Sequence, residues 1–330
     1  MEDDSPCNSS QAQFSNQQKA ILLYIYGGVG VISTLCCVFA LIVAVRYRFY
    51  QDIVQRLVLY QLIAALAVSL ICAFDIIFVN YHKNPDVYQP FCAMAAYFNT
   101  VSLWTKIGFT FWLSLLLFIC LVYLKQPKDV KKLEPLYILT SFGIPMLFSW
   151  IPFANDLYGI SGAWCWIKNW EGECANKKIL LGTIEQYALF YAPATVFFLI
   201  DAILITATVI VLLKRIRRNN VSEEQLLLGE NRKQKQLLRM ILPLSVYPVV
   251  SIFLYIFPFS NRVYSIIDDK PIFPLFILHG VTEPLWGCCV GIVVTVHICI
   301  AKSKRSSSGD TGMRSVTDHY TLPKDSMSFE

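Results

Sequence analysis

Seven long apolar blocks dominate the sequence and constrain its fold more than any other feature. A run of about 18 or more apolar residues with few charges can cross the hydrocarbon core of a membrane as one helix. Charged residues make up only 15% of the chain, against roughly 25% in soluble proteins. The blocks cover residues 20–45, 57–79, 92–124, 136–154, 179–213, 237–259 and 272–300. The sequence therefore predicts an all-α membrane protein with a seven-transmembrane-helix bundle.

Lysine and arginine are distributed unevenly among the connections between these blocks. The first, third and fifth connections and the C-terminal tail hold 19 basic residues. The N-terminal segment and the other three connections hold seven, including Arg262 in the sixth connection. Because basic residues accumulate on the cytoplasmic side, we expect the N-terminus outside and the C-terminus inside. This asymmetry explains most of the net charge of +5, which therefore does not indicate a nucleic-acid partner.

The chain divides into three parts. We expect an extracellular N-terminal segment over residues 1–19, a seven-helix domain over 20–301 and a disordered cytoplasmic tail over 302–330. The tail is rich in serine and threonine and has few apolar residues to bury. It is either a plain solvated tail or a cluster of kinase sites that recruits arrestin-like regulators, and the sequence leaves both open. Asn8 begins an Asn-Ser-Ser glycosylation sequon on the expected outer side.

Four of the eleven cysteines fall on the expected outer side, where disulfides persist. They are Cys7, Cys92, Cys165 and Cys174, and four cysteines allow three pairings. A bridge from Cys92, which opens the third block, to Cys165 in the fourth connection would hold that loop over the mouth of the bundle. It would leave Cys7 and Cys174 as a second pair, which only the even number supports.

Polar residues inside membrane helices usually face the bundle interior and often mark function, because lipid disfavours them. Here they are Asp75, Lys106, Glu185, Asp201, His279, Glu283 and His297. Lys106 lies roughly 21 Å into the third block and Glu283 about 16 Å into the seventh, at about 1.5 Å per residue. The two could therefore form an ion pair. Such a pair either only stabilises the bundle or is broken by a ligand or by activation.

The carboxylates of the outer half bear on the charge of a ligand. Asp75 and Glu185 lie near the outer ends of their helices, where a small ligand would enter. Together with Glu283 they outnumber Lys106. The sequence therefore favours a ligand that is not strongly anionic.

Several functional classes are disfavoured by what the helices lack. A retinal protein needs a lysine in the last helix, and residues 272–300 contain none. A zinc hydrolase needs clustered ligands, but His279 and His297 lie some five turns apart on one helix. No Ser-His-Asp arrangement is legible, so we expect no enzyme activity, metal or cofactor. The alternative function is a seven-helix transporter or channel that uses three buried charges, Lys106, Asp201 and Glu283.

A tryptophan-flanked cysteine in the fourth connection, Trp164-Cys165-Trp166-Ile167, resembles a family signature. The family is that of the cyclic-AMP-receptor-like G-protein-coupled receptors, which includes slime-mould cyclic AMP receptors and related animal orphan receptors. Leu278-His279-Gly280, with Gly287 seven residues later, is similar to the seventh helix of the orphan branch. Residues 56–60 and the Trp104-Thr105 pair resemble its second and third helices. The resemblance spans about residues 20 to 300.

The marks of rhodopsin-like receptors are missing from the chain. Leu121-Val122-Tyr123 stands where an acidic-Arg-Tyr triplet would end the third helix, and no Asn-Pro-x-x-Tyr closes the seventh. The resemblance thus implies a plasma-membrane receptor of a different family, which binds a small extracellular ligand in the outer half of the bundle and activates a heterotrimeric G protein. It also implies that Cys92 is the partner of Cys165.

Three positions depart from the family pattern. Glu283 stands where the orphan branch tends to have Asn, Trp286 where it tends to have Gln, and Lys106 where an apolar residue is expected. Because these changes fall in the presumed core, the resemblance does not carry over the family's ligand. The matched gain of Lys106 and Glu283 supports their pairing.

Two sets of site residues are expected, one for the ligand and one for the G protein. The expected ligand-binding residues are Asp75, Trp104, Lys106, Trp164, Trp166, Glu185, His279 and Glu283. The expected G-protein contacts are the basic residues Lys214, Arg215, Arg217, Arg218, Arg232, Lys233 and Lys235. Contact with anionic membrane lipids is compatible with the same basic side chains.

Overall fold

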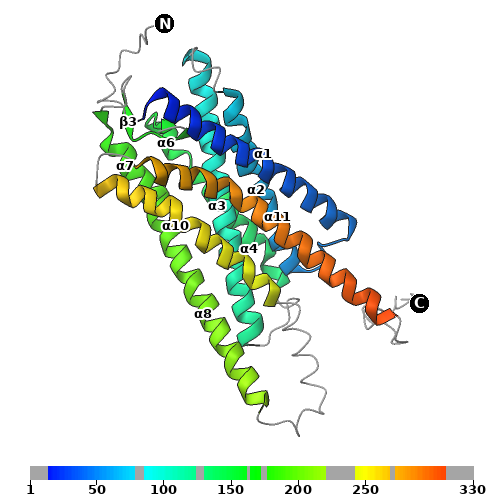
Figure 1. The fold of residues 1–330 in the computed structure, drawn as a ribbon. Helices are drawn as coiled ribbons and strands as arrows, with labels where there is room; N and C mark the ends of the chain where they lie inside the picture. The colour runs from blue at the N-terminus through cyan, green and yellow to red at the C-terminus, as the bar shows by residue number, and fades with distance from the viewer. Residues whose placement is uncertain are drawn as a thin grey trace, which may run out of the picture.

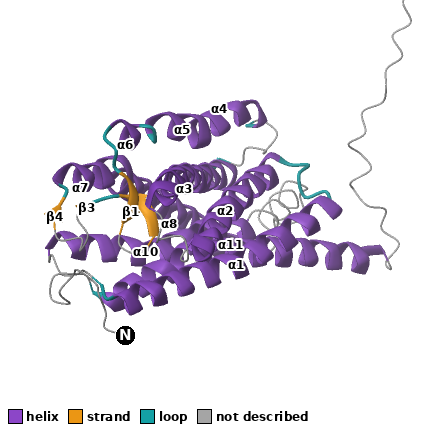
Figure 2. Cartoon of the chain, turned by 90° about the horizontal axis from the view of Figure 1, so that it is seen from above, coloured by secondary structure: helices purple, strands orange, loops and turns teal. Residues whose placement is uncertain are grey.

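The computed structural model describes residues 14–78, 85–123, 130–161, 164–171, 177–220, 242–267 and 272–309. Within these ranges, seven helical segments are long and apolar enough to cross a membrane. They form one bundle with α3 near its centre (Figures 1 and 2). The segments are Gln17–Arg46, Ile53–Asp75, Gln89–Val122, Lys131–Ala154, Leu180–Lys214, Val246–Ser265 and Phe273–Ile300. The predicted seven-helix membrane bundle is confirmed.

The first three spans are continuous helices: α1 (Asn16–Arg46), α2 (Ile53–Phe78) and α3 (Pro85–Val122). α1 begins at a capping box, because the Ser15 hydroxyl accepts from the backbone N–H of Gln18 and the Gln18 side chain accepts from the backbone N–H of Ser15. α3 begins seven residues before Cys92, where the third block was expected to start. Proline starts a helix well because the N–H that it lacks would have no partner in the first turn.

The fourth and fifth spans are interrupted by π-turns. The fourth contains η2 (Lys131–Leu133), α4 (Glu134–Ile138), the π-turn η3 (Leu139–Gly143), α5 (Ile144–Phe148) and α6 (Ile151–Ala154). The fifth contains α7 (Leu180–Gln186), the π-turn η4 (Tyr187–Tyr191) and α8 (Ala192–Asn220). Each π-turn is followed two residues later by a proline, Pro145 or Pro193. Proline cannot donate to the carbonyl four residues earlier and clashes with it, and a wider turn relieves that clash.

The last two spans run past their expected ends. After η6 (Leu242–Ser245), α10 (Val246–Ile267) continues eight residues beyond residue 259. Arg262, which we expected in the sixth connection, is therefore inside α10 and only 3% exposed. The helix can continue because Arg262 finds a partner inside the bundle, the Tyr191 hydroxyl.

The expected boundary of the tail is also displaced. α11 (Phe273–Gly309) continues past residue 302, where disorder was expected. No proline or glycine lies in residues 292–308 to interrupt it. Lys302 holds this extension to the end of α1, because its Nζ donates to the Tyr47 hydroxyl at 3.2 Å. Residues 310–330 lie outside the described part of the chain.

Short strands lie at the end of the bundle where α1 begins, which we call the hairpin end. β1 (Tyr158–Ser161) and β2 (Trp164–Ile167) are antiparallel, with Ile160 opposite Cys165. β3 (Trp170–Glu171) pairs with β4 (Lys177–Lys178). All four residues of β2 are buried, and both strands of the first hairpin pack on α3. The all-helical prediction did not contain these strands.

α11 packs closely on α1 and α2 because it carries glycines at the contact. A Cβ atom added to Gly287 would lie 2.5 Å from Ser33 Oγ and 2.7 Å from Ser69 Oγ. A Cβ added to Gly291 would lie 2.9 Å from the carbonyl oxygen of Cys36. These distances are too short for a side-chain carbon, so the two glycines set how closely α11 approaches its neighbours.

Candidate functional site

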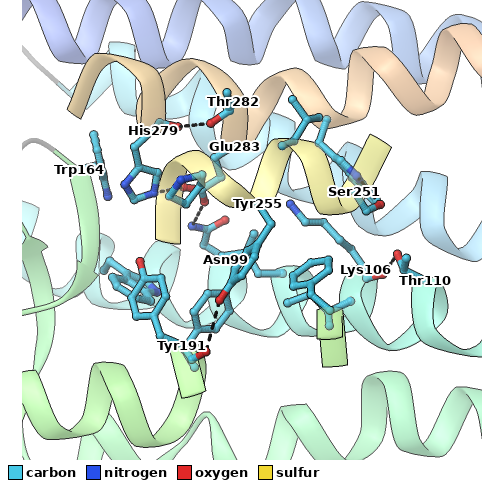
Figure 3. Close-up of a pocket in the computed structure, with 18 residues that line it drawn as sticks. Asn99, Lys106, Thr110, Trp164, Tyr191, Ser251, Tyr255, His279, Thr282 and Glu283 are labelled. Atoms are coloured by element: carbon cyan, nitrogen blue, oxygen red, sulfur yellow. Dashed lines mark hydrogen bonds and ion pairs between the residues drawn. The ribbon is translucent and has the colours of Figure 1, made fainter. Parts of the chain in front are cut away.

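A cavity lies inside the bundle beneath β2 (Figure 3). Its walls come from α3, β2, η4, α8, α10 and α11. The polar and aromatic lining residues are Asn99, Lys106, Thr110, Trp164, Trp166, Phe190, Tyr191, Phe198, Ser251, Tyr255, His279, Thr282, Glu283 and Trp286.

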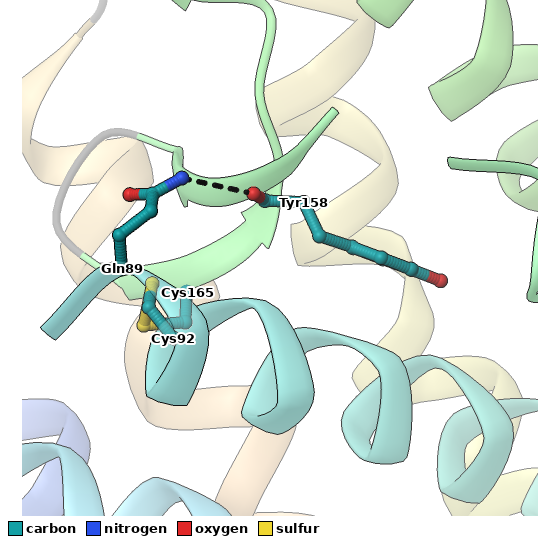
Figure 4. Close-up of a disulfide and its surroundings, with 4 residues drawn as sticks. All are labelled: Gln89, Cys92, Tyr158 and Cys165. Carbon is teal, nitrogen blue, oxygen red and sulfur yellow. Dashed lines mark hydrogen bonds between the residues drawn. A yellow bond between two sulfur atoms is a disulfide. The ribbon is translucent and has the colours of Figure 1, made fainter. Parts of the chain in front are cut away.

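The hairpin that covers this cavity is fixed to two spans. Cys165 of β2 is bonded to Cys92 of α3, and Gln89 donates a 3.3 Å hydrogen bond to the Tyr158 carbonyl of β1 (Figure 4). The Tyr158 hydroxyl donates to the Ser149 carbonyl at 2.9 Å. Burial raises the pKa of this hydroxyl above its ordinary value, so it stays a protonated donor. The hairpin is therefore held between α3 and the fourth span.

Two tryptophans of β2 form the roof of the cavity. Trp166 donates through its indole N–H to Thr100 of α3 at 3.1 Å. Trp164 stacks on Tyr26 of α1 with ring centroids 5.2 Å apart, and it meets the His279 ring edge-on at 4.9 Å. The Trp-Cys-Trp segment thus packs against α1, α3 and α11 at once.

A hydrogen-bonded chain crosses the cavity at Glu283. Glu283 Oε1 accepts from Asn99 Nδ2 at 3.2 Å, and Oε2 lies 3.1 Å from His279 Nε2 (Figure 3). Asn261 Nδ2 lies 3.1 Å from His279 Nδ1. Because an amide nitrogen only donates, Nδ1 is the acceptor and Nε2 carries the proton that faces Glu283. This network joins α3, α10 and α11 and is satisfied with a neutral imidazole.

Lys106 extends across the cavity but does not form the expected ion pair with Glu283. Among the described residues, no carboxylate oxygen lies within 4.0 Å of its Nζ. The ammonium instead lies 4.7 Å from the Trp286 ring centroid, as a cation–π contact. In Figure 3 the amine lies between Ser251 and Glu283. Asn99 and His279 already engage the two oxygens of Glu283.

A second buried cation lies behind the cavity wall. Arg262 of α10 donates through Nε to the Tyr191 hydroxyl at 3.2 Å. Its guanidinium carbon lies 5.1 Å from the Trp166 ring centroid and 5.9 Å from that of Phe276. Arg262 does not itself line the cavity, whereas Tyr191 and Trp166 do. It therefore supports two lining side chains from behind.

The structure brings together five of the eight expected ligand-binding residues: Lys106, Trp164, Trp166, His279 and Glu283. The other three lie outside the cavity lining. Asp75 is buried in α2, and Glu185 accepts a hydrogen bond from Asn155. Asp75 and Glu185 therefore do not add to the charge of the cavity, because Glu283 is the one carboxylate among the described lining residues.

Trp104 is turned away from the cavity. It lies two residues before Lys106, so the two side chains point about 200° apart around the helix. Its indole donates to the Leu189 carbonyl at 3.2 Å. Pro193, four residues later, has no N–H for that carbonyl. Trp104 therefore supplies a bond that the proline removes.

Several lining residues were missed by sequence reasoning, among them Asn99, Tyr191, Ser251 and Tyr255. Asn99 lies seven residues before Lys106, which is two turns on the same helix face. That spacing could have identified it. The aromatic and hydroxyl residues carry no such signal, because similar side chains are scattered through all the apolar blocks.

Other expected site residues are only partly described. Lys214 is exposed in α8, at the end of the bundle opposite the hairpins. The remaining expected G-protein contacts, and the residues expected to carry a glycan or a second disulfide, lie outside the described side chains. They are Arg215, Arg217, Arg218, Arg232, Lys233, Lys235, Asn8, Cys7 and Cys174.

The comparisons with known proteins agree with this architecture. The family model of the slime mold cyclic AMP receptor matches residues 10–293, a range that includes every residue lining the cavity. No curated protein matches the chain. Because the match covers well over half of the 330 residues, the resemblance carried by the Trp164–Ile167 segment is confirmed. The chain belongs to the slime mold cyclic AMP receptor family.

Proposed function

We propose that the protein is a G-protein-coupled receptor of the plasma membrane that binds a small extracellular ligand in the cavity beneath β2. Membership of a receptor family supports receptor activity, without naming the ligand or the partner of this chain. The observation that carries the proposal further is the cavity in the bundle interior, which is lined by polar and aromatic side chains and roofed by Trp164 and Trp166.

The arrangement of the cavity suggests how a ligand would act. A ligand in it would touch α3, α8, α10 and α11 together, and those helices would have to adjust to it. Binding favours whichever arrangement of the helices gives the better contacts. The two π-turns and the prolines of the fourth and fifth spans are positions where such helices can bend.

The fifth span supplies a candidate surface for the G protein. Residues 180–220 extend for roughly 60 Å at about 1.5 Å per residue, about twice the thickness of the hydrocarbon core. α8 therefore reaches well beyond the neighbouring helices (Figure 1). We assign its basic end, from Lys214 onward, to the cytoplasm on the positive-inside rule, where it would meet a G protein and anionic lipids.

The alternative of a transporter or channel has less support. It requires Lys106, Asp201 and Glu283 to share one water-filled path. Lys106 and Glu283 line the cavity, but Asp201 is fully buried in α8 and does not.

A cavity-filling pair of variants tests the proposal. Intact cells that express the chain with G-protein dissociation sensors would be exposed to a panel of membrane-impermeant metabolites. Cyclic AMP belongs to the panel because the family's description names it. Leu254→Trp puts a large side chain at the cavity wall, whereas Phe253→Trp puts it at a position that is 60% exposed.

We expect at least one metabolite to dissociate a G protein in the wild type and in Phe253→Trp. In Leu254→Trp its potency should fall at least tenfold, which corresponds to about 1.4 kcal/mol. Equal responses in the two variants would move the ligand site elsewhere. Substrate-coupled ion flux without dissociation of any G protein would favour the transporter.

A further inference from the structure

The polar groups that line the cavity are nearly all used within the protein. Thr282 donates to the Leu278 carbonyl of its own helix, and Ser251 donates to the Tyr247 carbonyl. Ser251 also accepts from the indole N–H of Trp286 at 2.8 Å. A ligand therefore meets few free partners on this side of the cavity.

The same holds for the other walls. The Thr110 hydroxyl donates to the Lys106 carbonyl and accepts from Gln61. Tyr255 donates to the Tyr191 carbonyl. The Glu283 carboxylate already has one donor on each oxygen, as described above. Both oxygens of the one carboxylate in the described lining therefore already have a partner within the protein.

The ammonium group of Lys106 is the main exception among the polar groups that line the cavity. Its ammonium has three N–H donors and forms no hydrogen bond or ion pair with any residue in the described ranges. The cation–π contact with Trp286 leaves those donors free for a ligand. The indole N–H of Trp164 and the O–H of Tyr191, whose oxygen accepts from Arg262, likewise have no described acceptor, and the buried Asn99 Oδ1 is an unused acceptor. The free groups are therefore mainly donors, and the strongest of them is charged.

We propose that the ligand of this cavity is a largely apolar small molecule with a single anionic group, and that this group binds the Lys106 ammonium. The proposal rests on the proposed function, because it names the ligand class of the same cavity. Aromatic side chains such as Trp166, Phe190 and Phe198 would cover the apolar body. A charged hydrogen bond in a site that excludes water is stronger than a neutral one.

This ligand class differs from a cyclic nucleotide. A nucleotide carries a purine edge and a ribose hydroxyl in addition to its phosphate, and each of these needs a partner when it is buried. A buried polar group without a partner costs about 1–3 kcal/mol. The described lining has one free cation for the phosphate and only three neutral groups, on Trp164, Tyr191 and Asn99, for the rest. The balance of free partners therefore favours an apolar anion over the ligand that the family's description names.

Matched acids and amides test the ligand class without a G protein. The purified full-length chain in lipid nanodiscs would be unfolded by heat with indole-3-propionate, 4-phenylbutyrate or 2-naphthylacetate, each beside its primary amide. Tryptamine and cyclic AMP complete the series. Because a ligand that binds only the folded state raises the unfolding midpoint, the shift reports relative affinity. We expect at least one acid to bind about tenfold more tightly than its amide, a difference of about 1.4 kcal/mol.

Three variants show whether Lys106 is responsible. Lys106→Met should remove the preference for the acid, and Lys106→Arg should keep most of it. Lys131→Met, which changes an exposed lysine at the opposite end, should leave the preference intact. The proposal is overturned if no acid raises the midpoint, or if an amide, tryptamine or cyclic AMP binds as tightly as the best acid. It is also overturned if the preference survives in Lys106→Met.

The G-protein sensors separate this result from the proposed function. An acid that binds through Lys106 without dissociating any G protein would sink the coupling proposal and support the ligand class. Dissociation driven by cyclic AMP, with no acid bound, would support the receptor mechanism and refute the ligand class.

Discussion

The two faces of α11 are packed in opposite ways. On one face, Gly287 and Gly291 bring the helix so close to α1 and α2 that no side-chain carbon would fit. On the other, His279, Glu283 and Trp286 face the cavity. Of the described residues that line this cavity, none belongs to α1 or α2.

The difference divides the bundle into two parts. We call the closely packed helices α1, α2 and α11 the platform, and the helices and hairpin around the rest of the cavity the binding region. Close packing on small residues is how helices associate in lipid, where the hydrophobic effect between helices is absent. The platform of α1, α2 and α11 thus fixes one wall of the cavity. Of the other walls, α3 is also packed closely, because a Cβ atom added to its Gly108 would lie 2.8 Å from the Cα of Ser141. α8 and α10 contain no glycine and are held by side-chain hydrogen bonds, so these two walls have more freedom to respond to a ligand.

The largest expected effect comes from releasing β2, whose Trp164 and Trp166 form the roof of the cavity in the binding region. Cys165→Ser removes a disulfide that joins residues 73 apart in sequence. Such a bridge contributes between about 2 and 4 kcal/mol to the free energy of unfolding. We expect a correspondingly lower unfolding midpoint for the purified chain, together with weaker binding of any cavity ligand, because Trp164 and Trp166 lose their tether.

Cys299→Ser is the matched control for this change, because Cys299 is an exposed free cysteine far from the hairpin end. It should leave both the midpoint and ligand binding unchanged. Equal midpoints for Cys165→Ser and the wild type would mean that the disulfide does not hold the roof.

The second effect tests the platform with one substitution at two positions. At Gly287 a Cβ atom would lie 2.5 Å from Ser33 Oγ, whereas at Gly280 its nearest contact would be Trp164 at 3.7 Å. Overpacking typically destabilises by about 1–3 kcal/mol. We therefore expect Gly287→Ala to lower the free energy of unfolding by about 2 kcal/mol, measured by thermal or denaturant unfolding. Gly280→Ala should be neutral or slightly stabilising, since alanine favours a helix. Two equal losses would contradict the contrast between the faces.

Hydropathy was sufficient to predict the platform and the number of spans. α1, α2 and α11 are continuous helices whose apolar blocks are visible in the sequence. The π-turns before Pro145 and Pro193 were not predictable in the same way, because the prolines indicate a distortion without its form. The strands were missed because a two- to four-residue strand has too few positions for an alternating pattern.

The cavity was predictable only in part, because its membership depends on how each helix is rotated. The tryptophans of β2 were found from the family resemblance, and Lys106 and Glu283 from their charge. Depth along the helix suggested that those two would pair, but depth does not fix direction. The hydrogen bonds from Asn99 and His279 to Glu283 depend on side-chain positions that no pattern in the sequence encodes.

The smallest expected effect concerns Trp104, which lies on α3 but points away from the cavity and bonds to the fifth span. In Trp104→Phe the Leu189 carbonyl loses its indole donor, and Pro193 cannot replace it. Because a hydrogen bond in a membrane protein contributes roughly 0.6–2 kcal/mol, the free energy of unfolding should fall by about 1 kcal/mol.

Trp150→Phe is the control for this variant, because Trp150 is 55% exposed and its indole donates to no described residue. It should leave the stability unchanged. Ligand binding should be unaltered in both variants, since neither tryptophan lines the cavity. A Trp104→Phe variant that keeps its unfolding midpoint but loses affinity for the best acid probe would return Trp104 to the ligand site. The separation between the cavity and the aromatic packing of α3 on the fourth and fifth spans would then have to be redrawn.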